Sequence, residues 1–183
     1  MKMQNYQKAA QRTSRGDHDR LHAGVLGLIG ESGEVVDILK KQLYQGLAQS
    51  KARELLIDEL GDVLWYIAEA CAGIGRDIAE LEALPVAGTR PRSLENRAVH
   101  LAARACELHT ALSRVEVDMY APQVAWPRLA AIYRTVLSIC EALGVAIGYV
   151  AGKNIRKLRG RYPEGFSEEI SSARYEDEED EDE

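Results

Sequence analysis

Residues 52–72 read ARELLIDELGDVLWYIAEACA, and this stretch decides the fold class. Its apolar residues recur at three- and four-residue steps and cover most of the circumference of a helix. A helix that is apolar nearly all round is typically buried, because every side of it needs a neighbour. We therefore expect residues 52–72 to form the central helix of a bundle.

The rest of the chain is helical in pattern as well. Strand-like alternation of β-branched residues is absent, and Ala, Leu, Glu and Arg dominate. Asp17 or Asp19 is the expected N-cap of the second helix, and Pro127 is expected in the first turn of the fifth. The pattern predicts an all-α bundle with helices at about 5–13, 20–44, 52–72, 94–114, 126–143 and 147–158.

Three glycines lie inside the second predicted helix, Gly27, Gly30 and Gly33. Each costs about 1 kcal/mol relative to alanine in a helix interior. We expect the close approach of a neighbouring helix or a ligand to offset that cost.

Charge is distributed unevenly along the 183 residues. The net charge is −6, but the last eight residues are all Asp or Glu, so the rest of the chain carries +2. This balance argues against a nucleic-acid-binding surface. We expect one domain over residues 1–167 and a disordered acidic tail over residues 168–183.

The expected cellular location follows from the apolar stretches, the N-terminal segment and the cysteines. No stretch approaches ~18 uninterrupted apolar residues, and the first twenty residues hold no hydrophobic signal segment. Three cysteines, Cys71, Cys106 and Cys140, lie in apolar helical runs and are expected in the core. These features predict a cytoplasmic protein without a membrane span.

Four carboxylates carry the chemistry. Glu31 and Glu34, and again Glu59 and Asp62, are spaced i, i+3, which places each pair on one helix face. Such pairs are common on solvated helix faces, but these two lie in the two most apolar helices. Buried carboxylates without partners cost several kcal/mol each. An all-oxygen site for Mg²⁺ or Mn²⁺ would offset that cost.

The sequence resembles MazG-like nucleotide pyrophosphohydrolases at four places, which follow one another in the right order. Gly30-Glu31-Ser32-Gly33-Glu34 and then Asp58-Glu59-Leu60-Gly61-Asp62-Val63-Leu64-Trp65-Tyr66 resemble the family's ExxE…ExxD signature. Residues 153–166, KNIRKLRGRYPEGF, resemble its final helix, and residues 6–10 with Thr13 resemble its opening helix.

This resemblance implies a reaction and a division of roles. The enzyme would split a nucleoside triphosphate into a monophosphate and pyrophosphate, with Mg²⁺ held by Glu31, Glu34, Glu59 and Asp62. One of these carboxylates would accept the proton of the attacking water. Substrate would be contacted by Asn154, Lys157 and Arg161 at the phosphates and by Tyr66. Tyr6 and Gln7 could reach the base if the first helix crosses the site.

The chain departs from compact family members between about residues 78 and 127, where it carries an inserted helical segment. Family members associate to complete their bundle, so the resemblance implies a homo-oligomer, a dimer or tetramer. The alternative is that the inserted helices supply the missing half within one chain.

Two other functions were weighed against this one. A di-iron carboxylate bundle requires Glu-x-x-His motifs, and the chain has none. A non-catalytic helical interaction module would explain the acidic tail but not four carboxylates in apolar helices. His18 and His22 are spaced i, i+4 but lack a third ligand, so they are interpreted as solvated side chains.

Overall fold

The computed structural model describes residues 1–16, 19–83, 93–115, 118–169 and 171–172. Within these ranges the protein is all-α, as predicted, and contains no strand. Asp17, His18 and most of the predicted acidic tail lie outside them. The elements are α1 Met3–Ala10, η1 Gln11–Thr13, α2 Arg20–Tyr44, α3 Gln49–Gly73, η2 Ile78–Ala83, α4 Leu94–Leu112, η3 Asp118–Tyr120, α5 Ala121–Ala142 and α6 Ile147–Arg161.

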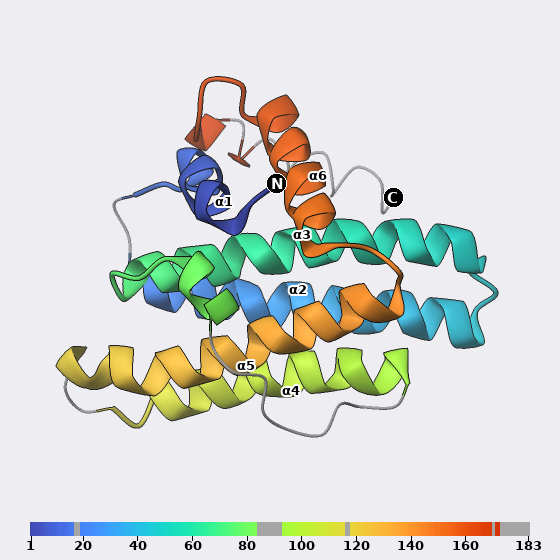
Figure 1. The fold of residues 1–183 in the computed structure, drawn as a ribbon, viewed down its shortest axis with the longest axis horizontal. Helices are drawn as coiled ribbons and strands as arrows, with labels where there is room; N and C mark the ends of the chain where they lie inside the picture. The colour runs from blue at the N-terminus through green and yellow to red at the C-terminus, as the bar shows by residue number, and fades with distance from the viewer. Residues whose placement is uncertain (17–18, 84–92, 116–117, 170, 173–183) are drawn as a thin grey trace.

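Helix α3 is the centre of the fold. It pairs with α2 along its length, and α4 and α5 form a second helix pair that covers both of them (Figure 1). Helices α1 and α6 pack on the opposite side of α3 and against each other. The all-round apolar pattern of α3 is explained, because neighbours lie on every side of it.

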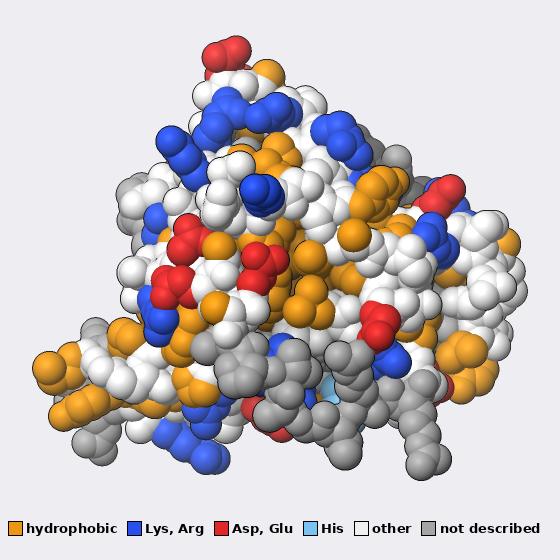
Figure 2. All heavy atoms as spheres, in the orientation of Figure 1, with side chains coloured by type: hydrophobic (Ala, Val, Ile, Leu, Met, Phe, Trp, Pro, Cys, Tyr) orange, Lys and Arg blue, Asp and Glu red, His pale blue; other side chains and the backbone are white. Residues whose placement is uncertain are grey.

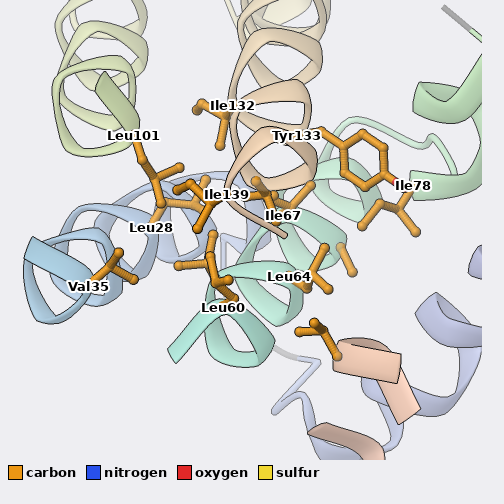
Figure 3. Packing of buried hydrophobic residues seen from close by; sticks show 14 of the residues in the cluster. Leu28, Val35, Leu60, Leu64, Ile67, Ile78, Leu101, Ile132, Tyr133 and Ile139 are labelled. Atoms are coloured by element: carbon orange, nitrogen blue, oxygen red, sulfur yellow. The ribbon is translucent and has the colours of Figure 1, made fainter. Parts of the chain in front are cut away.

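One hydrophobic core joins the helices (Figure 3). It receives side chains from both faces of the α2–α3 pair, and full burial of each stabilises the fold by about 1.5–3 kcal/mol. The fully buried members include Leu28 and Val35 of α2, Leu60, Leu64 and Ile67 of α3, Leu101 of α4, and Ile132 and Ile139 of α5.

The fifth helix differs from its prediction. It begins at Ala121, so that Pro122 occupies its first turn and Pro127 lies inside it. Because α5 runs through residue 127, the predicted end of the insertion falls within a helix. The α4–α5 pair continues to Ala142 and covers the face of α2 and α3 for which a second chain was expected.

Some local expectations are confirmed and one is wrong. The Asp19 carboxylate caps α2 by accepting a hydrogen bond from the His22 backbone N–H at 3.0 Å. Cys71 and Cys140 are buried, whereas Cys106 is exposed because it faces outward from α4.

Among the described residues, no single helix has the length and apolarity to cross a membrane. Helices α5 and α6 together pass that test, with a bend of 99° between them.

Candidate active site

The pairing of α2 with α3 brings three of the four predicted carboxylates together. Glu31, Glu59 and Asp62 each offer one oxygen, and these oxygens all lie within 4.8 Å of one another. We call these three residues the carboxylate trio. Glu34 lies one turn further along α2, exposed and outside the trio, but it lines the same cavity.

Small residues allow α2 and α3 to approach closely beside the trio. A Cβ added to Gly27 would lie 2.1 Å from the Tyr66 ring, and one added to Gly24 would lie 2.7 Å from the backbone nitrogen of Ala70. The expectation of a close neighbour is therefore confirmed at Gly27. At Gly30 and Gly33 an added Cβ would meet nothing within 4 Å.

Burial and mutual repulsion disfavour the ionised forms of the carboxylates in the trio. Burial, followed by the charges of Asp62 and Glu59, raises the pKa of Glu31 to about 7. Burial and then the charge of Asp62 also raise the pKa of Glu59. The ammonium of Lys157 opposes both shifts. A bound cation would stabilise the ionised forms in the same way.

Helix α6 approaches the trio at Asp62. Lys157 Nζ donates to Asp62 Oδ2, and Asn154 Nδ2 donates to Asp62 Oδ1 at 2.9 Å. Lys157 also lines the cavity. Asn154 is 3% exposed and lies behind Asp62. The structure gives Asn154 a contact with a carboxylate, and the phosphate contact that the resemblance implied stays a prediction.

The trio lies in a cavity of about 700 Å³. Lys157, Arg161 and Tyr66, all predicted to contact substrate, line it. Further lining residues were not predicted, although most of them fall within the stretches that carry the family resemblance: Thr13, Trp65, Leu158, Tyr162, Phe166 and Ser171.

The N-terminal segment forms one wall of this cavity. Trp65 Nε1 donates to Thr13 Oγ1 at 2.9 Å, and the Phe166 backbone N–H donates to the Arg12 carbonyl at 3.0 Å. These bonds tie the segment before α2 and the loop after α6 to one another and to α3.

Tyr6 and Gln7 do not reach the cavity. Tyr6 is fully buried, and its hydroxyl donates to Asn154 Oδ1 at 2.8 Å. The Gln7 side chain donates to the Arg76 carbonyl at 2.8 Å and accepts from the Ile78 backbone N–H at 2.7 Å. The condition for base contacts, that the first helix crosses the cavity, is not met, because α1 turns Tyr6 and Gln7 inward against α3, η2 and α6.

One face of the molecule carries a group of positive side chains next to a group of negative ones (Figure 2). Lys and Arg side chains gather over the region of α1 and α6, and Asp and Glu side chains gather beside an apolar patch below them (Figure 2). Such a neighbouring arrangement of opposite charges suits a ligand that is anionic and that binds together with a cation.

Comparison with known proteins agrees with the sequence motifs. Residues 20–89, which include all four predicted carboxylates, match the family described as "MazG nucleotide pyrophosphohydrolase domain". The resemblance to the MazG-like family is thus confirmed for the α2–α3 region, whereas Asn154, Lys157 and Arg161 lie outside the matched residues.

A curated relative covers a similar length of sequence. The "Gene 37 protein" of Mycobacterium phage L5 is 38% identical over 73 aligned residues, and the alignment covers 35% of this chain and 64% of that protein. The match therefore spans somewhat less than two thirds of the relative's length. No solved structure matches the chain significantly.

Proposed function

We propose that this chain, whose α2 and α3 are MazG-like, hydrolyses a nucleoside triphosphate between its α- and β-phosphates. Water would attack the α-phosphorus, the bond to the bridging oxygen would break, and a nucleoside monophosphate, pyrophosphate and a proton would leave. The observation that carries the proposal is the carboxylate trio, with its oxygens within 4.8 Å of one another. It shares one cavity with Lys157 and Arg161.

The residues present fit a hard divalent cation, Mg²⁺ or Mn²⁺. All donors in the trio are carboxylate oxygens, which these ions prefer. Glu31, Glu59 and Asp62, whose oxygens lie within 4.8 Å of one another, would hold this ion. A bound ion would neutralise phosphate charge and lower the pKa of a bound water.

The other polar residues of the cavity would hold the substrate. Glu34 would be the fourth carboxylate, completing the metal site from the next turn of α2. Lys157 would place a point charge at the phosphates, and Arg161 would offer a planar, two-pronged donor. One of the carboxylates would accept the proton of the attacking water.

Aromatic rings in the same cavity would contact the nucleobase. Tyr66 packs edge-on against Trp65, with ring centroids 4.9 Å apart, and Tyr162 stacks on Phe166 at 6.2 Å. All four rings line the cavity. Such rings offer flat apolar surface with hydrogen-bonding edges, which suits a base.

The test is a substrate panel of canonical and damaged nucleoside triphosphates, assayed with Mg²⁺ and with a chelator. Pyrophosphate and nucleoside monophosphate are expected in equal amounts, only when the ion is present. Release of inorganic phosphate and a diphosphate would instead indicate cleavage at the outer bond.

Two variants sharpen the assay. Glu59→Gln should abolish product formation, because it removes a charged ligand from the trio. Asp58→Asn is the matched control, since Asp58 is the adjacent residue but pairs with Lys153 at 2.6 Å, outside the cavity. If no nucleotide yields pyrophosphate, the non-catalytic interaction module becomes the better explanation.

A further inference from the structure

A chain of buried hydrogen bonds connects the first helix to the carboxylate trio. Tyr6 Oη donates to Asn154 Oδ1 at 2.8 Å, and Asn154 Nδ2 donates to Asp62 Oδ1 at 2.9 Å. Tyr6 is 0% exposed and Asn154 is 3% exposed. The chain therefore runs through the protein interior, from α1 through α6 to α3.

The Tyr6 hydroxyl and the Asp62 carboxylate together fix which way the Asn154 amide points. A phenol that donates its hydrogen requires an acceptor, so the amide oxygen faces Tyr6 and the amide nitrogen faces Asp62. The reversed amide would place its oxygen against the Asp62 carboxylate and its nitrogen against the phenol. Burial raises the pKa of Tyr6 well above its usual value, so the phenol stays protonated and keeps this donor.

The backbone of α3 is adapted to this contact. A Cβ at Gly61 would lie 2.9 Å from the Asn154 Cβ, so only glycine lets α6 approach here. The Gly61 carbonyl also lies 3.3 Å from Tyr6 Oη, as a second and longer acceptor. This close approach lets Asn154 reach and hold the carboxylate of Asp62, the residue after Gly61.

We propose that Tyr6 is a positioning residue for the metal centre, which sets divalent-cation affinity by holding Asp62 in place through Asn154. This inference rests on the proposed function, since it assumes that the trio binds a cation. Tyr6 itself does not line the cavity. Partners that orient metal ligands typically change metal affinity by about 10–100-fold when they are removed.

The test measures Mn²⁺ binding to the full-length protein by electron paramagnetic resonance, without nucleotide. Tyr6→Phe removes only the hydroxyl and should weaken Mn²⁺ binding by about tenfold or more. Tyr133→Phe is the matched control, because Tyr133 is also fully buried and its hydroxyl bonds Glu82 at 3.4 Å, away from the trio. That variant should bind Mn²⁺ as the unmodified protein does.

A double-mutant cycle separates positioning from general loosening. Asn154→Ala should also weaken binding, and adding Tyr6→Phe to it should cause no further loss, because Tyr6 acts only through Asn154. Equal weakening in the Tyr6→Phe and Tyr133→Phe variants, or additive losses in the double variant, would overturn the inference.

Failure of the inference is distinguishable from failure of the proposed function. If the unmodified protein binds Mn²⁺ and Tyr6→Phe binds it equally well, Tyr6 has no positioning role, and the metal site stands. If the unmodified protein binds no Mn²⁺, the metal assignment falls and the inference falls with it. Should Tyr6→Phe fail to fold by circular dichroism, Asn154→Ala alone decides, since unchanged affinity there also breaks the chain.

Discussion

Gly61 of α3 and Asn154 of α6 are in such close contact that an added Cβ would lie 2.9 Å from the Asn154 Cβ. The residues are far apart in sequence, and their contact places the Asn154 amide against Asp62. The packing of two helices and the geometry of the candidate metal site therefore depend on the same pair.

Gly61→Ala should destabilise the protein. The new methyl group would push α6 away, at a cost of about 1–3 kcal/mol. This cost exceeds the helix-propensity gain of about 1 kcal/mol. Urea denaturation measures the difference in the free energy of unfolding. Gly30→Ala is the control, since its Cβ would meet nothing within 4 Å, and it should raise stability by up to about 1 kcal/mol. Equal effects of the two substitutions would contradict the packing argument.

The carboxylates should contribute unequally to metal binding. Glu59→Gln removes a member of the trio and should weaken Mn²⁺ binding by well over about tenfold, more than the loss of an orienting partner. Glu34→Gln should weaken it less, because Glu34 lies outside the trio and is exposed. Titration calorimetry with each variant checks this order. If Glu34→Gln weakened binding more than Glu59→Gln, the ion would lie nearer to Glu34, one turn further along α2.

Metal affinity should fall in acid. The pKa of Glu31 is raised to about 7, so below that pH a cation must displace a proton from this carboxyl. The apparent affinity should then decrease by up to about tenfold per pH unit below 7, and level off above it. Mn²⁺ titrations between pH 5.5 and 8.5, in ~0.5-unit steps, follow this change. The apparent Mn²⁺ affinity should depend less steeply on pH in the Glu31→Gln variant.

The same pKa shift makes a prediction for stability in the presence of a chelator. Because the folded pKa of Glu31 lies above its ordinary value, the unfolded chain releases this proton first as the pH rises. Stability from this group is therefore present at low pH and lost as the pH rises to about 7. In thermal denaturation with a chelator, the melting temperature of the Glu31→Gln variant should rise relative to that of the unmodified protein as the pH is raised from acid to about 8. A constant difference would contradict the assigned shift.

The protein should be monomeric. Helices α4 and α5 cover α2 and α3 within one chain, which is the alternative to assembly that the sequence left open. Light scattering should give a mass near 20.3 kDa. Twice that mass, independent of concentration over a tenfold range, would show that another surface joins two copies.

The sequence alone determined the secondary structure and the identity of the acidic residues. Apolar periodicity is a local property, so it placed the helices to within a few residues and marked α3 as the buried one. The i, i+3 spacing likewise placed Glu31 with Glu34, and Glu59 with Asp62, on single helix faces. One failure is also local in origin: Pro127 satisfied the rule for a first turn, but Pro122 satisfied it earlier in the chain.

Only the tertiary structure decided which residues meet. Asn154 and Asp62 are 92 residues apart, and Tyr6 and Asn154 are 148 apart, so no local pattern reports either contact. The tertiary structure also left Glu34 outside the trio, turned Tyr6 and Gln7 inward and placed α4 and α5 over α2. The approach of α2 to α3 at Gly27 depends on Tyr66, and that of α6 to α3 at Gly61 depends on Asn154, and both side chains come from distant segments.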